Sequence, residues 1–199
     1  MFKINNRNTS EPYLKFYEYC MKAQKCNQKF IDAVVISSLN KTNNEVEARY
    51  VNLKYINNDK WIFFTNYNSP KAQNFLSHNQ ISVLFFWSEI NIQVRIKATI
   101  EKTDKKTSDE HFKNRSRKRN LLAISSDQSK KINSYENVKK LYENESKLNK
   151  KKLHRPDYWG GFSFTPYYFE FWRGEDNRIN KRKVYKLIDN KWEQYFLQP

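Results

Sequence analysis

The sequence predicts a single α+β domain in which hairpin-linked strands form an antiparallel barrel with peripheral helices. Segments rich in β-branched and aromatic residues follow one another through short polar turns, as in antiparallel sheets. Helical segments are inserted between groups of strands, which argues against a doubly wound parallel sheet. The 199 residues are 38% hydrophobic and 16% aromatic, enough for one core, and no repeat or boundary divides them. We therefore expect one domain over residues 1–199.

The strands are predicted from apolar runs bounded by polar turns. In residues 91–100 an apolar side chain occupies every second position, so Gln93 points away from the core. The predicted strands cover residues 30–39, 47–56, 60–65, 81–87 and 91–100, and the segment 158–197 is also rich in strand formers.

The helices are predicted from capping residues and apolar spacing. Ser10, Ser69 and Asn133 are candidate N-caps, and Thr107 with Glu110 forms a capping box. The predicted helices cover residues 10–25, 69–77, 107–117 and 133–148; residues 1–10 are expected to be flexible, 121–129 mixed and 149–156 a basic linker.

The formal net charge of +16 attracts polyanions and small phosphorylated ligands alike. Much of it lies in lysine runs such as residues 150–152, which are usually solvated. RNA-binding motifs of the common families are missing, so a nucleic-acid partner is not expected. The charge alone leaves a small phosphorylated ligand and a polyanion open.

The cysteines, the histidines and the lengths of the apolar runs exclude further classes of protein. Two cysteines and three scattered histidines fit neither a disulfide framework nor a zinc site, so we predict no metal. The N-terminal residues lack an apolar signal segment, and no run could span a membrane. We expect a cytoplasmic protein with reduced thiols.

Glycine content limits how a nucleotide could be bound. The chain has only three glycines, Gly160, Gly161 and Gly174. A dinucleotide fingerprint or a Walker A loop needs several at fixed spacing. Any nucleotide must therefore be held in another way.

Two segments could bind phosphate. Ser69-Pro70-Lys71 begins a helix, and the free N–H groups there, a hydroxyl and an ammonium are all donors. Arg49 and Lys54 lie five residues apart, hence on opposite faces of a regular strand. By themselves, both segments would equally suit an ordinary surface.

An aromatic side chain near two guanidiniums is a third candidate for ligand binding. Trp172 precedes Arg178 and Arg182, an arrangement that suits stacking on a planar ring but also an ordinary core.

Taken in order, these segments resemble the pyridoxamine 5'-phosphate oxidase family over residues 11–199. The matching stretches are Arg49-Tyr50-Val51-Asn52-Leu53-Lys54, Phe63-Phe64-Thr65-Asn66-Tyr67 with Ser69 and Lys71, Val83–Trp87, Gln93–Ile96, Asp127-Gln128-Ser129, Trp159–Phe162, Glu170-Phe171-Trp172, Arg178 with Arg182, and Leu197 with Pro199.

The resemblance implies a split β-barrel homodimer with flavin mononucleotide (FMN) at the subunit interface. One side of the FMN site would comprise Arg49, Tyr50, Val51, Lys54, Phe64, Thr65, Ser69, Lys71 and Gln93. The partner subunit would supply Gln128, Ser129, Trp172 and Arg182. In this family a hydride passes from a vitamin B6 phosphate to the flavin, and oxygen reoxidises the flavin to give pyridoxal 5'-phosphate and hydrogen peroxide.

The substrate side of the resemblance combines matches with departures. The expected substrate-binding residues are Lys54, His111, Arg115, Arg119, Arg178 and Asn180, with Arg178 also catalytic. His111, Arg119 and Asn180 replace a tyrosine, a serine and a histidine of the family, and Pro70 replaces an arginine next to the phosphate-binding lysine. The substrate-covering N-terminal segment of some members is not recognisable.

Three hypotheses therefore follow from the sequence. The first is an FMN-dependent pyridoxamine/pyridoxine 5'-phosphate oxidase. The second is a related FMN oxidoreductase with another substrate, as in the phenazine-pathway members. The third is a basic, non-catalytic protein that binds FMN, a phosphorylated ligand or nucleic acid.

Overall fold

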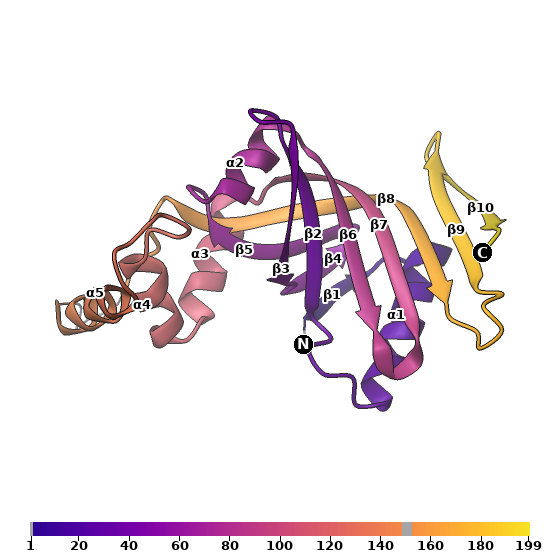
Figure 1. The fold of residues 1–199 in the computed structure, drawn as a ribbon, viewed down its shortest axis with the longest axis horizontal. Helices are drawn as coiled ribbons and strands as arrows, with labels where there is room; N and C mark the ends of the chain where they lie inside the picture. The colour runs from indigo at the N-terminus through magenta and orange to yellow at the C-terminus, as the bar shows by residue number, and fades with distance from the viewer. Residues whose placement is uncertain (1, 149–152) are drawn as a thin grey trace.

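The computed structural model describes residues 2–148 and 153–199 and has an α+β architecture, as predicted (Figure 1). The strands are β1 (Lys3–Arg7), β2 (Ala33–Asn40), β3 (Glu45–Asn52), β4 (Tyr55–Asn58), β5 (Lys60–Asn66), β6 (Gln80–Trp87), β7 (Ile92–Lys102), β8 (Trp159–Arg173), β9 (Lys181–Ile188) and β10 (Lys191–Leu197). The α-helices are α1 (Glu11–Lys25), α2 (Pro70–Ser77), α3 (Lys105–Asn114), α4 (Arg117–Ser125) and α5 (Tyr135–Leu148). A 3₁₀ turn, η1 (Ser88–Ile90), joins β6 to β7.

The strands form one open sheet in the order β1-β4-β5-β8-β7-β6-β2-β3, with β9 and β10 continuing from β8. Almost all neighbours are antiparallel, as predicted, but β1 pairs with β4 in parallel. Residues 3–7, which were expected to be flexible, therefore form a strand, and this strand is an exception to the predicted antiparallel pairing. Phe2 explains the order of this segment, because its ring is 4% exposed and lies 6.2 Å from that of Phe16.

The long strand β8 connects the two ends of the molecule. In Figure 1 it runs from the cluster of α3, α4 and α5 to the hairpin of β9 and β10. It pairs with β5 near its start, with β7 along most of its length, and with β9 near its end. Residues at the two ends of β8 therefore lie in different regions of the molecule.

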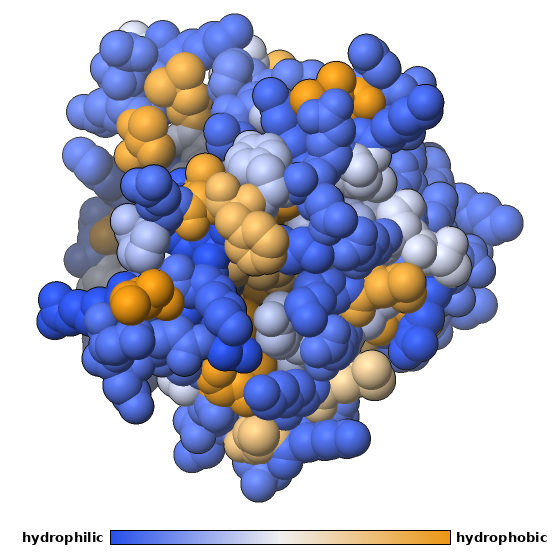
Figure 2. Space-filling model, turned by 90° about the vertical axis from the view of Figure 1, so that its right-hand side faces the viewer, coloured by the Kyte–Doolittle hydropathy of each residue, from blue (hydrophilic) through white to orange (hydrophobic). Residues whose placement is uncertain are grey.

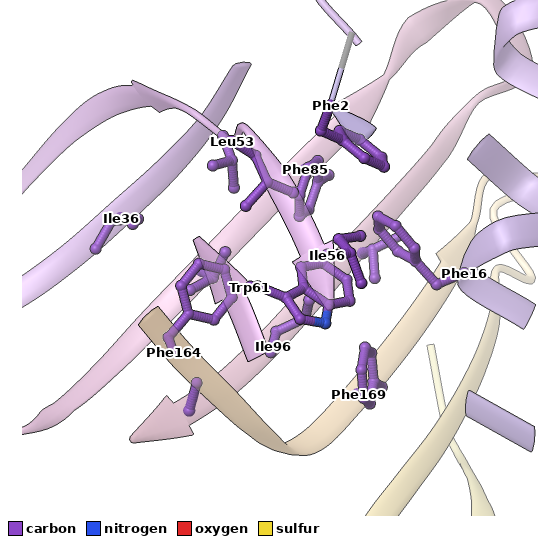
Figure 3. Packing of buried hydrophobic residues seen from close by; sticks show 14 of the residues in the cluster. Phe2, Phe16, Ile36, Leu53, Ile56, Trp61, Phe85, Ile96, Phe164 and Phe169 are labelled. Carbon is purple, nitrogen blue, oxygen red and sulfur yellow. The ribbon is translucent and has the colours of Figure 1, made fainter. Parts of the chain in front are cut away.

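The core is mainly aromatic and centres on Trp61, which is fully buried (Figure 3). The ring centroid of Phe16 on α1 lies 4.5 Å from that of Trp61, and the Phe164 ring of β8 lies 5.7 Å from it. Tyr13, one helical turn before Phe16, makes an edge contact with Phe169 at 5.2 Å. The apolar spacing of α1 therefore anchors this helix to the sheet, as predicted.

Several predicted boundaries are wrong for local reasons. The predicted strand 47–56 breaks at residues 53–54, where the backbone N–H of Leu53 turns to donate to Asp32. The helix predicted from Thr107 begins at Lys105, because the carboxylate of Asp104 accepts the Thr107 N–H at 2.7 Å. It ends at Asn114, and the segment expected to be mixed from residue 121 continues α4 up to Ser125.

Two predicted caps also differ. The Ser69 hydroxyl donates to the carbonyl of Asn66 at 2.7 Å and does not accept a helix N–H. At the start of α5 the Ser134 hydroxyl, and not Asn133, accepts the Asn137 N–H at 3.2 Å. Of the predicted basic linker, residues 149–152 lie outside the described residues.

The surface is mostly hydrophilic, with hydrophobic side chains in separate groups on the face seen in Figure 2. Within residues 2–148 and 153–199, no helix is long and apolar enough to cross a membrane.

Candidate active site

A cavity of about 820 Å³ lies where β3, β4 and β5 meet α3 and α4. Ten of the predicted site residues line it: Tyr50, Val51, Lys54, Phe64, Thr65, Lys71, His111, Arg115, Arg119 and Gln128. They come from six segments between residues 50 and 128, so the fold brings together groups that are distant in sequence. The volume is in the range of small-molecule sites.

Lys71 forms the most buried charged group of the cavity. It lies in the first turn of α2, is 9% exposed, and its Nζ donates to the Ser69 hydroxyl at 3.1 Å. Burial, with a smaller contribution from Arg49, lowers the pKa of Lys71 to about 8. Within the described part of the chain no carboxylate pairs with it. A buried ammonium without a counter-ion favours a bound anion.

Arg49 borders the same region, although it does not line the cavity. It donates to the Ser38 hydroxyl at 3.1 Å and pairs with Glu47. On a regular strand, Arg49 and Lys54 would point to opposite faces. Because β3 ends at Asn52, Lys54 lies outside any regular strand and lines the cavity. Lys54 reaches Asp32 at 3.5 Å.

Gln128 lies on the same side of the site as Thr65. Its Oε1 accepts the backbone N–H of Asn66 at 3.2 Å and the Thr65 hydroxyl at 3.4 Å. The sequence interpretation assigned Gln128 and Ser129 to the partner's side, whereas Gln128 adjoins Thr65 of its own chain. Ser129 is exposed, has a positive φ of 70° and does not line the cavity.

A group of nearly parallel rings forms one wall of the cavity. The imidazole of His111 stacks on Phe64 with centroids 3.7 Å apart, and the Trp159 ring lies 5.5 Å from Phe64 and 6.1 Å from His111. The Tyr55 hydroxyl lies 2.8 Å from Nδ1 of His111. Burial, followed by the charge of Arg115, lowers the pKa of His111 to about 4, so the imidazole is neutral at pH 7.

The charge of the cavity is strongly positive. Its described lining contains five cations, namely Lys3, Lys54, Lys71, Arg115 and Arg119, and one carboxylate, Asp32. Arg115 lies over the Trp159 ring at 4.9 Å and donates to the carbonyl of Arg119 at 2.8 Å. Such a cavity selects an anionic ligand.

Sequence reasoning missed Lys3, Tyr55 and Trp159 as lining residues. Lys3 lies in the segment expected to be flexible, and its backbone N–H donates to the carbonyl of Lys54 at 2.8 Å. Tyr55 directly follows Lys54, so its position next to a predicted site residue was the available signal.

The remaining predicted residues lie at the far end of β8. Trp172 is in register with Gln93 on one side and with Arg182 on the other. Gln93, predicted on the Lys71 side of the site, therefore lies beside Trp172. Thirteen residue steps of about 3.3 Å separate Trp172 from Trp159 at the cavity.

Arg178 and Asn180 lie in the loop between β8 and β9, near Trp172 and outside the lining of the cavity. Arg178 is exposed with a positive φ of 62°, and Asn180 accepts the Glu175 N–H through Oδ1 at 3.1 Å. One subunit thus holds two separate halves of the predicted site. Among the described residues there is no cluster of His, Cys, Asp or Glu that could bind a metal ion.

Comparison with known proteins identifies the family. Residues 27–141 match the family model described as pyridoxamine 5'-phosphate oxidase, and residues 159–199 match the pyridoxine 5'-phosphate oxidase C-terminal dimerisation region. A pyridoxine/pyridoxamine 5'-phosphate oxidase of Hydrogenovibrio crunogenus is 33% identical over 98% of this chain and 92% of its own length. One of Bacteroides thetaiotaomicron is 34% identical over 95% of this chain and 89% of its own.

Two solved structures share the fold. The PhzG protein of Burkholderia lata, solved with tetrahydrophenazine-1-carboxylic acid, aligns with a TM-score of 0.89 at 22% identity, over 96% of this chain and 93% of its own. A pyridoxamine 5'-phosphate oxidase-related, FMN-binding protein of Nostoc punctiforme aligns with a TM-score of 0.77 at 12% identity, over 96% and 99% of the two chains. From the family-model match and the relatives over nearly its whole length, the chain belongs to the pyridoxamine 5'-phosphate oxidase family.

Proposed function

We propose that this protein is an FMN-dependent oxidase that converts pyridoxamine or pyridoxine 5'-phosphate to pyridoxal 5'-phosphate and reduces O₂ to H₂O₂. The observation that carries the proposal is the cationic cavity, in which ten predicted site residues meet around a buried, carboxylate-free Lys71. The protein would act as a split-barrel homodimer with FMN between the subunits.

The cofactor is FMN, and the cavity fits it. Lys71, Ser69 and Arg49 would hold the FMN phosphate, because they combine a buried ammonium, a hydroxyl and a guanidinium near one helix N-terminus. When bound, FMN supplies the hydride-accepting and oxygen-reducing chemistry of the reaction. Phe64 and Thr65 would contact it from the same subunit.

The substrate phosphate would bind to Lys54, Arg115 and Arg119. These cations line the cavity, Arg115 and Lys54 close enough to His111 to lower its pKa, and the stacking of Arg115 on Trp159 fixes the position of its guanidinium. Arg178 would reach the substrate, as the catalytic arginine, from the partner subunit. Asn180, Trp172, Arg182 and Gln93 would come with it, because they lie together at the far end of β8.

The reaction can be followed directly. Purified protein loaded with FMN is given pyridoxine 5'-phosphate in air, and the formation of pyridoxal 5'-phosphate and H₂O₂ is measured. We expect both products in equal amounts. Arg115→Gln, which keeps a hydrogen-bonding side chain without the charge, should raise KM, whereas Arg173→Gln on the exposed end of β8 should not. FMN-loaded protein that forms no product would refute the proposal.

A second function within the same family is favoured by His111. Its stacking on Phe64 and its contact with Tyr55 leave one ring nitrogen, Nε2, for a ligand. A neutral imidazole recognises a phosphate less strongly than a cation does. An FMN oxidoreductase acting on another anionic substrate would therefore bind FMN and leave pyridoxine 5'-phosphate unchanged.

A further inference from the structure

Glu170 is a buried carboxylate outside the cavity, and the proposed reaction has no role for it. It lies on β8 two residues before Trp172 and is 1% exposed. Oε1 accepts Arg182 Nε at 2.9 Å and pairs with Nη2 at 2.8 Å. Oε2 accepts Arg95 Nη1 and the Tyr168 hydroxyl, at 3.0 and 3.1 Å. Both carboxylate oxygens are thus occupied.

The guanidinium of Arg182 is held mainly by Glu170. Two of its three guanidinium nitrogens face Glu170, and Nη1 donates to the carbonyl of Gln198 at 3.0 Å. A guanidinium held by two nitrogens on one oxygen has little rotational freedom. Arg182 is also the cross-strand neighbour of Trp172, whose other neighbour is Gln93. Glu170 therefore fixes the orientation of one member of this row.

Arg95 balances the buried charge from the other side. Its side chain is 48% exposed, and it contacts the oxygen that Arg182 leaves free. A buried carboxylate loses much solvation, which two guanidiniums and a hydroxyl can replace. Both oxygens of the carboxylate thus have charged or hydroxyl partners beside the row of Gln93, Trp172 and Arg182.

We propose that Glu170 is a positioning residue for FMN binding, acting through Arg182, which it holds beside Trp172 in the orientation that meets the flavin of the partner subunit. The inference rests on the proposed function, in which Arg182 contacts FMN across the dimer. It predicts that loss of the Glu170 charge weakens FMN binding only while Arg182 is present.

A double-mutant cycle tests this coupling. FMN is titrated into the apo dimers of wild type, Glu170→Gln, Arg182→Gln and the double variant, with flavin fluorescence as the readout. We expect Glu170→Gln to weaken FMN binding about tenfold and the double variant to match Arg182→Gln within about twofold. Glu101→Gln is the matched control, because it removes an exposed ion pair with Lys60 on the same sheet and should leave FMN binding unchanged.

The Glu170→Asp variant helps to distinguish a displaced Arg182 from a folding defect, since it keeps the charge but shortens its reach to Arg182. It should also weaken FMN binding, while the visible circular dichroism of bound flavin changes as it does in Glu170→Gln. Wild-type affinity in both variants, or a double variant whose loss is the product of the two single losses, would overturn the inference alone. A wild-type dimer that does not bind FMN would overturn the proposed function and the inference together.

Discussion

At the scale of single residues, the site depends on side chains whose pKa values are changed by their surroundings. Lys71 and His111 are both partly removed from water, which lowers the pKa of each. The sequence indicated both residues, because Lys71 follows Ser69 at a helix start and His111 stands where the family has a tyrosine. It could not indicate their protonation, which depends on Arg49, Arg115 and burial brought about by the fold.

Lys71 should make FMN binding depend on pH. The phosphate favours the charged ammonium, so binding raises a pKa that is about 8 in the free protein. Binding then takes up a proton above pH 8, and the affinity should fall there by up to about tenfold per pH unit. Titrations of FMN between pH 7 and 9.5 would measure this slope.

The matched variants are Lys71→Met and Lys60→Met. The first should bind FMN about 10- to 100-fold more weakly at pH 7, the loss expected for a charged hydrogen bond, and should lack the slope. The second removes an exposed lysine paired with Glu101 and should behave as wild type. A slope that persists in Lys71→Met would assign the proton to another group.

His111 should make the fold less stable in acid. Its folded-state pKa of about 4 lies below the ordinary value of 6.5, so the unfolded chain binds an extra proton between these values. Stability from this group is therefore full above pH 6.5 and is lost as the pH falls towards 4, by roughly 1–3 kcal/mol. Urea unfolding of wild type and His111→Phe at several pH values should show a smaller loss in the variant; parallel curves would contradict a neutral, buried His111.

At the scale of elements, the start of β8 closes the cavity by close backbone approach. Gly161 donates its N–H to the Ser108 hydroxyl at 3.1 Å, and its carbonyl accepts the Tyr67 hydroxyl at 3.2 Å. A Cβ at Gly161 would lie 2.6 Å from Thr103 Oγ1 and 3.0 Å from the Phe64 ring. The glycine therefore lets α3 and the Phe64 ring pack against β8.

Gly161→Ala should destabilise the protein by about 1–3 kcal/mol, the usual cost of overpacking, and should weaken FMN binding through Phe64. Thermal unfolding and FMN titration would measure the two effects. Gly174→Ala is the control: the atoms that its Cβ would meet belong to Asn91, whose exposed side chain can move. Equal effects of the two substitutions would show that close packing at Gly161 has no special role.

At the scale of the whole molecule, the sequence predicted the α+β class, most strands and ten of the residues that line the cavity. Alternating patterns such as residues 92–100 and the helix start at Ser69-Pro70 carry that information locally. Two features of the site depend on contacts between residues distant in sequence, so local patterns could not predict them. The parallel pairing of β1, which brings Lys3 to the cavity, depends on the burial of Phe2, and the placement of Gln93 depends on its register with Trp172.

The two halves of the predicted site lie at opposite ends of β8, and the C-terminal segment matches a dimerisation region. The central claim is therefore that one FMN site needs two subunits, with Lys71 from one and Arg182 from the other. Lys71→Met and Arg182→Gln dimers should each bind FMN poorly, since each variant damages both sites of its dimer.

Subunit mixing tests this claim most directly. When the two variants are co-refolded in equal amounts, random pairing makes about half of the dimers mixed, and each mixed dimer has one intact site and one doubly damaged site. We predict that tight FMN binding returns to about a quarter of all sites, measured by fluorescence titration at a concentration where neither variant alone binds. A mixture that binds no more FMN than its two components would contradict a site shared between subunits.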